Sequence, residues 1–129
     1  MRFAFSDDSL GVNRPLIDVS IDEFEQPLRC LIDTGSLRTR LPGWIADALV
    51  LDLAESPSER VSVGGRITTA RQSHVSLVLA GGTVPSSVWF CEPWDAPFGL
   101  IGQEDVLCAF HLRYSAGEEW FELTPASLA

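Results

Sequence analysis

The sequence contains no lysine, so nine arginines alone carry its basic charge, against eighteen aspartates and glutamates. The formal net charge is −9. Nucleic acids and anionic membrane surfaces are themselves negative, and they would repel a chain of this charge. We therefore expect neither a nucleic acid nor a membrane as a partner. Two copies that associate must overcome their own repulsion.

Cysteine and histidine are also scarce. The three cysteines, Cys30, Cys91 and Cys108, are an odd number at wide spacings, and they fit neither a disulfide framework nor a Cys-x-x-Cys zinc pattern. We expect three reduced thiols, as in a protein of the cytoplasm. Because His74 and His111 have no ligand residue beside them in the sequence, no metal site is predicted.

Long apolar segments are absent as well. No run approaches the roughly 20 residues that a membrane-spanning helix needs. Residues 1–5 are followed closely by Asp7 and Asp8, which leaves no hydrophobic segment for a secretory signal. Together with the reduced thiols, this pattern predicts a cytoplasmic location.

The chain does contain the pattern of many short strands. Its length of 129 residues predicts a single domain, residues 1–129. Turn signals recur about every 10 residues, which is typical of an all-β protein. Strands are expected at 16–21, 28–32, 61–79 with an interruption at 64–65, 84–91, 100–101, 110–114 and 119–123. Short helices are expected at 44–51 and 103–109.

The most informative segment is the run Asp33-Thr34-Gly35-Ser36, which directly follows an apolar stretch. A carboxylate at the end of a buried strand costs free energy unless hydrogen bonds compensate it. The two hydroxyls and the glycine N–H are groups that supply such bonds. The simplest interpretation is an Asx-type turn at a strand end, which needs no function.

Three segments in order resemble the retropepsin-like aspartic proteases. Residues 30–42 resemble the active-site strand and loop of that family, in which Asp-Thr-Gly is followed by Ser or Ala and, after two variable residues, by a small hydroxyl residue. Residues 98–102 look like the family's second signature, two apolar residues and a glycine. Residues 63–67 resemble its glycine-rich flap, which closes over the substrate.

The resemblance implies a retropepsin-like closed β-barrel that acts as an aspartic endopeptidase on a polypeptide substrate. In that chemistry two aspartates share one proton, hold a water between them and hydrolyse the peptide bond. No metal or organic cofactor is required. Because this chain has only one Asp-Thr-Gly, the second aspartate has to come from a second copy, so the resemblance implies a homodimer with Asp33 as the catalytic residue.

The resemblance also assigns roles around Asp33. Thr34 and Ser36 support the pair of aspartates, Thr34 by reaching the partner loop and Ser36 by a hydrogen bond to the Asp33 carboxylate. Gly35 accepts substrate hydrogen bonds through its backbone.

Further substrate-binding residues are expected in the flap and the cleft wall. Gly64 and Gly65 correspond to the flap tip, where the lack of side chains allows opening and closing. Leu100 and Ile67 are candidates for the apolar wall of the cleft, although packing in the core would explain them equally well.

The sequence departs from the family at one ion pair. Members of the family often carry an arginine after the second signature, paired with an aspartate after Asp-Thr-Gly, but these positions hold Gln103 and Leu37 here. We expect a reversed pair instead, between Arg38 and either Glu104 or Asp105.

Four tryptophans are a high number for a chain of 129 residues. Burial in the core or in a dimer interface is the simpler expectation for Trp44, Trp89 and Trp120. Trp94 is the best candidate for an aromatic at the rim of the cleft. The neighbouring Asp95 is interpreted as a solvated loop residue.

Two alternatives remain open from the sequence. The same fold can serve as a dimerisation or peptide-binding module that is catalytically silent. An unrelated small β-barrel can also contain Asp-Thr-Gly by coincidence. For the protease interpretation, the chain ends at 2–5 and 120–123 are expected to pair in a sheet shared by two subunits.

Overall fold

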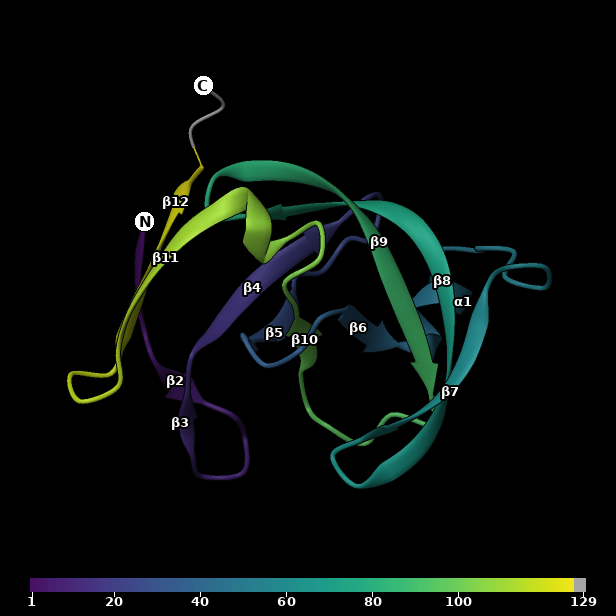
Figure 1. Ribbon diagram of the computed structural model, residues 1–129, viewed down its shortest axis with the longest axis horizontal. Coiled ribbons are helices and arrows are strands. Elements are labelled where there is room, and N and C mark those ends of the chain that lie inside the picture. Colours follow the sequence, from purple (N-terminus) through teal and green to yellow (C-terminus); the bar gives the residue numbers. More distant parts are fainter. Residues whose placement is uncertain (127–129) are drawn as a thin grey trace.

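The computed structural model describes residues 1–126, and most of them lie in strands (Figure 1). The elements in chain order are β1 (Arg2–Ala4), β2 (Ser6–Asp7), β3 (Asn13–Arg14), β4 (Leu16–Ile21), β5 (Leu28–Ile32), β6 (Thr39–Pro42), α1 (Gly43–Ala48), β7 (Ser58–Val63), β8 (Arg66–Leu79), β9 (Gly82–Glu92), β10 (Gly99–Ile101), the 3₁₀ turn η1 (Leu107–Ala109), β11 (Phe110–Ser115) and β12 (Trp120–Pro125). No helix among these residues has the length and apolar character needed to cross a membrane.

Six strands close into a barrel. Their order is β4-β5-β10-β6-β9-β8, and pairing of β4 with β8 completes the circle. β5 pairs with β10, and β6 with β9, in parallel, whereas the other neighbours are antiparallel. β7 pairs only with β8 and continues the sheet beyond the barrel as a hairpin arm. The all-β prediction with a short helix is confirmed, and the architecture is a closed barrel.

The barrel closes because each strand has one apolar face. In β4, Ile17, Val19 and Ile21 are almost fully buried, while Asp18 and Ser20 are exposed. Strands alternate their side chains with a period of two, so this pattern turns one face inward. Full burial of such a side chain stabilises the fold by about 1.5–3 kcal/mol.

The two chain ends meet in a second, three-stranded sheet of order β1-β12-β11. Arg2 of β1 lies opposite Glu122 of β12, and the Phe3 and Phe121 rings stack with centroids 5.1 Å apart. The ends were expected to pair between two subunits, but they already pair with each other within one chain. The expected segment 119–123 extends to Pro125 as β12, and residues 127–129 lie outside the described part.

The helix expected at 44–51 is shorter than predicted, because α1 ends at Ala48. Val50 adopts a left-handed φ of 56°, and the Leu51 N–H donates to the Ala46 carbonyl. This is the hydrogen-bond pattern of a Schellman helix end, with valine at the position that glycine usually occupies.

The second expected helix, at 103–109, was wrong. The segment is a series of turns that ends in η1. Asp105 has a left-handed φ of 65°, and its Oδ2 accepts a hydrogen bond from the Ser87 N–H at 2.8 Å. That tertiary bond replaces the helical path that the local sequence favours.

Candidate active site

Asp33 directly follows β5, at the end of the parallel pair formed by β5 and β10. Its N–H donates to the Ile101 carbonyl at 3.0 Å, which continues the β5–β10 pairing by one residue. Ile32 points into the core, so Leu31 and Asp33 project from the opposite face of the sheet. The Asp33 residue is partly exposed. The fold thus presents one carboxylate outside the barrel on a strand fixed from within.

A tight turn follows Asp33. Its Oδ1 accepts a hydrogen bond from the Gly35 N–H at 3.1 Å, and its carbonyl accepts one from the Ser36 N–H at 3.1 Å. The Ser36 hydroxyl donates to the Arg38 carbonyl at 2.7 Å. The expectation that Ser36 binds the Asp33 carboxylate was therefore wrong, because the hydroxyl bridges its own loop. Thr34 is exposed.

The segment after β10 fixes the far side of this loop. The buried Thr39 Oγ1 accepts a hydrogen bond from the Gly102 N–H at 3.1 Å. A Cβ at Gly102 would collide with the Arg38 carbonyl group, so no larger residue fits. The N–H of Gln103 donates to the Ser36 carbonyl at 2.9 Å. Sequence reasoning did not select Thr39 or Gly102 as site residues, although the small hydroxyl residue and the second glycine were visible signals.

Of the two positions that depart from the retropepsin-like pattern, Gln103 has a partner in the loop and Leu37 faces solvent. Gln103 donates from Nε2 to the Thr34 carbonyl at 2.6 Å, and Leu37 is 61% exposed. The expected pair of Arg38 with Glu104 is present as a long ion pair of 3.8 Å. Asp105, the other expected partner of Arg38, binds the backbone of β9 instead.

The hairpin turn between β7 and β8 is confirmed at Gly64 and Gly65. Their φ angles are 58° and 81°, which residues with a side chain adopt at a cost. Nothing lies within 4 Å of a Cβ placed on either glycine. Figure 1 shows this turn extending from the barrel beside the segment that precedes β10. An ion pair of 2.7 Å between Arg66 Nη1 and Asp95 Oδ2 links the two, so the exposed Asp95 is also a paired residue.

A cavity of about 290 Å³ lies beneath this turn. Trp94, the expected rim aromatic, lines it and donates from Nε1 to the Phe98 carbonyl at 3.0 Å. Other lining residues are Leu10, Arg14, Val63, Gly64 and Phe98. The cavity is therefore mainly apolar and aromatic, with charged groups at its edge.

Leu100 and Ile67 occupy different faces. Leu100 is half-buried and lies directly opposite Leu31, on the face that carries Asp33. Ile67 is 60% exposed, and it alternates with Thr68, whose side chain lines the cavity. Within one chain, Ile67 thus points away from the cavity, on the α1 side of the hairpin where Thr69 and Arg71 lie.

The strand register places Leu100 in a row of side chains that crosses four strands. Leu31, Leu100, Arg40 and Trp89 lie opposite one another across β5, β10, β6 and β9, so their side chains share one face. Trp89 and Trp94 belong to a small apolar cluster outside the main core, whereas Trp44 is exposed. Trp120, partly buried, lies under the Arg2 guanidinium in the end sheet.

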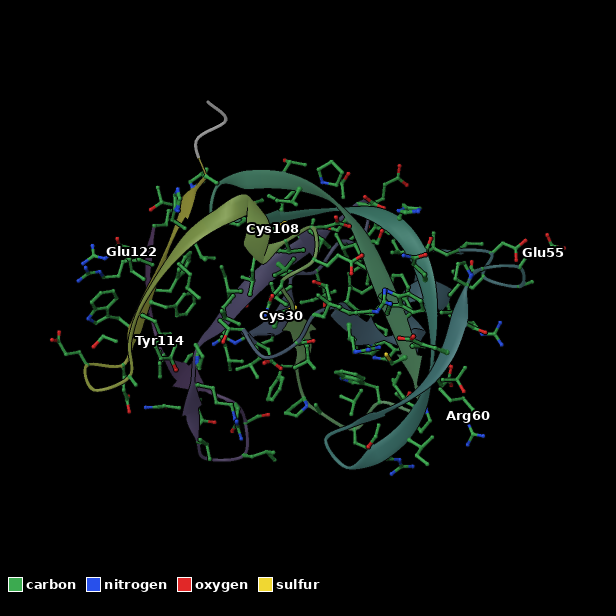
Figure 2. All side chains as sticks on the ribbon, in the orientation of Figure 1. Cys30, Glu55, Arg60, Cys108, Tyr114 and Glu122 are labelled. Carbon is green, nitrogen blue, oxygen red and sulfur yellow. The ribbon has the colours of Figure 1, made fainter. Side chains whose placement is uncertain are left out.

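The cysteines are free thiols, as expected. Cys30 lies inside the barrel, near the centre of Figure 2, and burial raises its pKa to about 12. Burial also raises the pKa of Cys91, against the opposing effect of Arg40. Cys108 is exposed on η1. The two buried thiols are protonated at neutral pH and serve as packing groups.

Within residues 1–126, no three histidine, cysteine or acidic side chains gather in a way that could hold a metal ion. No protein-family model and no curated protein matches this chain.

Proposed function

We propose that this protein is an aspartic endopeptidase of the retropepsin-like type, active as a homodimer. The observation that carries the proposal is the position of Asp33. It ends a central barrel strand, its carboxylate is oriented by the Gly35 N–H, and it lies on the face that also carries Leu100. A glycine-tipped hairpin and an apolar cavity complete that side of the molecule.

The chemistry needs a second carboxylate. Two carboxylates about 3 Å apart cannot both ionise, so such a pair retains one proton. The ionised member takes a proton from the bound water, while the protonated member donates to the oxygen of the scissile carbonyl. One chain supplies a single aspartate in an Asp-Thr-Gly turn, and the symmetry of a dimer supplies the other.

The surface around Asp33 supports contact between two copies. Thr34 and Gly35 are exposed, and Leu37 leaves 61% of its surface in solvent. An exposed apolar side chain beside two small residues suits close approach of two loops. Because each copy carries a charge of −9, salt should strengthen the dimer by screening the repulsion.

The substrate would be an extended peptide. It would lie between the Leu31–Leu100 row and the β7–β8 hairpin, with its backbone hydrogen bonds setting the register. Opening and closing of the Gly64–Gly65 turn would admit the peptide and exclude water. The cavity of about 290 Å³ would receive one apolar side chain.

The test is Asp33→Asn. Cleavage of a diverse peptide library between pH 4 and 7, followed by mass spectrometry, should fall to background while sedimentation still shows the dimer. Asp47→Asn, an exposed change of the same chemistry on α1, is the control and should cleave normally. Cleavage retained by Asp33→Asn would contradict the proposal. A wild type that binds peptides but cuts none would favour the silent binding module.

A further inference from the structure

Two arginines stand side by side on the face of the barrel that carries Asp33. Arg38 and Arg40 are two residues apart at β6, and the intervening Thr39 points into the core. Trp89 of β9 lies directly opposite Arg40, and the Arg38 guanidinium lies over its ring at 4.3 Å from the centroid. We call Arg38, Arg40 and Trp89 the donor cluster.

The donor cluster has many N–H groups and few acceptors. Each guanidinium offers five N–H donors. The nearest carboxylate oxygens lie at 3.5–3.8 Å, on Glu59 and Glu104, beyond the usual hydrogen-bond length of 2.7–3.2 Å. The one hydrogen bond from either arginine side chain within residues 1–126 goes from Arg40 to the Cys91 sulfur, a weak acceptor.

Trp89 adds an independent sign of a missing acceptor. Its residue is 6% exposed, and its indole N–H is the one buried side-chain polar atom without a partner in the part of the chain that the structure describes. A buried donor without an acceptor costs free energy. Such groups call for an explanation, and a ligand that brings an oxygen atom supplies one.

The cluster lies on the Asp33 face, beyond Leu100. Leu100 stands between Leu31 and Arg40 in the register, so Arg40 lies two strand spacings, about 10 Å, from β5. The Arg40 guanidinium contacts Cys91 Sγ of β9 and lies 3.5 Å from Glu59 of β7, so its N–H groups are turned away from β5. At about 3.3 Å per residue, an extended peptide held at Asp33 reaches the donor cluster with a residue several positions from the scissile bond.

We propose that the donor cluster binds a carboxylate of the peptide, either an aspartate or glutamate side chain several positions from the scissile bond or the carboxyl terminus. The inference rests on the proposed function only in taking a peptide to lie at Asp33. Two neighbouring guanidiniums can donate to the two oxygens of one carboxylate, and charge-assisted bonds of this kind are strong. Their partial burial, with Arg40 at 12% side-chain exposure, reduces screening by solvent.

Glu59 occupies the same place from the hairpin side. Its Oε1 lies 3.6 Å from Arg38 and 3.5 Å from Arg40, so one carboxylate oxygen already lies between the two guanidiniums. A peptide carboxylate has to compete with it. Removing the charge of Glu59 should therefore strengthen the preference for a carboxylate, whereas removing the charge of Arg40 should abolish it.

A purely structural role for the cluster predicts something else. In that case the arginines only hold β7 against the barrel through Glu59. Arg40→Gln would then lower stability and reduce the cleavage of all peptides alike. The ratio between a glutamate peptide and its glutamine twin separates the two roles, because loss of folded protein cancels in a ratio.

The experiment uses pairs of peptides that differ only by glutamate or glutamine at each position around the cleavage site, each made as a C-terminal acid and amide. Binding is measured on Asp33→Asn, which leaves the peptides intact, and cleavage on the wild type. Both backgrounds are combined with Arg40→Gln, Glu59→Gln and Arg60→Gln. Arg60→Gln is the matched control, because it removes one arginine charge at an exposed residue of β7 whose side chain points outward in Figure 2. Circular dichroism checks folding, and Arg40→Lys replaces Arg40→Gln if the latter unfolds.

We expect one position, or the terminal carboxylate, to be favoured about tenfold or more over its amide twin. Arg40→Gln should bring the ratio to about one, Arg40→Lys should lower it, Glu59→Gln should raise it and Arg60→Gln should leave it unchanged. A preference for a glutamate peptide over its glutamine twin identifies a side-chain carboxylate. A preference for the C-terminal acid over the amide identifies the carboxyl terminus.

Three results would overturn the inference: equal affinity for every acid and amide pair, a ratio that Arg40→Gln or Arg40→Lys leaves intact, or no peptide binding at all. Cleavage without a preference would contradict carboxylate binding by the donor cluster but support the endopeptidase activity. Preferential binding without cleavage by the wild type would support carboxylate binding but contradict the endopeptidase activity.

Discussion

The turn after Asp33 and the turn at Gly64–Gly65 both border the Asp33 face, but they are held in opposite ways. Backbone bonds to the 102–104 segment and a buried threonine hydroxyl fix the first turn on several sides. The second has no atom within 4 Å of its glycine Cβ positions. Behind it, the exposed Arg66–Asp95 ion pair and a hydrogen bond from Thr68 Oγ1 to the Pro93 carbonyl join the hairpin to the segment before β10.

This difference matches what a hydrolase needs from each region. A carboxylate that activates water has to be placed within a few tenths of an ångström, so its loop must be rigid. A flap has to open for the substrate, so its contacts must be few and weak. Exposed ion pairs such as Arg66–Asp95 stabilise a fold by about 0–1 kcal/mol, so this contact breaks readily.

The largest expected effect comes from filling the tight contact behind the rigid turn. Gly102→Ala should lower the free energy of unfolding by about 3 kcal/mol, because the added methyl group meets the Arg38 carbonyl and both backbone segments are bonded in place. Gly117→Ala is the control, since nothing lies within 4 Å of its Cβ position. Chemical denaturation measures both, and an equal, small effect would show that the 36–38 loop is not rigid.

Removing the buried acceptor of that turn should have the next largest effect. Thr39→Val keeps the shape but leaves the Gly102 N–H without its partner, at a cost of about 2 kcal/mol. Thr124→Val, the same exchange at an exposed residue of β12, should be nearly neutral. If both variants unfold at the same denaturant concentration as the wild type, the hydroxyl does not hold the turn.

The Gly64–Gly65 turn should tolerate change better. Gly64→Ala places a side chain in open space, so its cost of about 1 kcal/mol comes only from the left-handed backbone. Gly64→Asn should cost less, because asparagine adopts this conformation more readily. Thermal unfolding compares the two. A loss as large as that of Gly102→Ala would mean that the Gly64–Gly65 turn is also packed.

A third loop on the same cavity gives the smallest effect, a stabilisation that is lost in acid. The buried Asp8 carboxylate accepts hydrogen bonds from Arg14 and from the N–H groups of Leu10 and Val12. The Arg14 hydrogen bond, aided by the backbone bonds, lowers the pKa of Asp8 below 3.8, against the opposing effect of burial.

Because this pKa is lower in the folded chain, its stabilisation is present above about pH 4 and is lost as the pH falls through the folded value. Asp8→Asn should therefore be less stable than the wild type at pH 6, and the two should converge in acid. A gap that stays constant down to pH 2 would contradict this origin.

Local patterns predicted most of the barrel. Alternation in β4 identified a buried face, and paired glycines located both the β7–β8 turn and the turn into β9. These signals depend on neighbouring residues alone, so a single sequence contains them. The C-terminal end of α1 was missed because Val50 adopts a left-handed angle that a β-branched residue disfavours. The 103–109 segment was missed because Asp105 bonds to Ser87, a contact that is distant in the sequence.

The surroundings of Asp33 were predictable only in part. The Asp-Thr-Gly turn has a local signature, but the signature does not determine the acceptor of the Ser36 hydroxyl, which is the Arg38 carbonyl of its own loop. The donor cluster was not predicted, because it depends on the parallel pairing of β6 with β9, almost 50 residues apart. No local pattern brings Arg40 and Trp89 together.

The central claim is that each of two copies contributes one Asp33 to a single active site. Mixing wild-type and Asp33→Asn chains, allowing exchange and measuring peptide cleavage tests it directly. If the site is shared, activity should fall with the square of the wild-type fraction, because every mixed dimer lacks one carboxylate. Activity that falls in direct proportion to that fraction would show that each chain acts alone and would contradict the account.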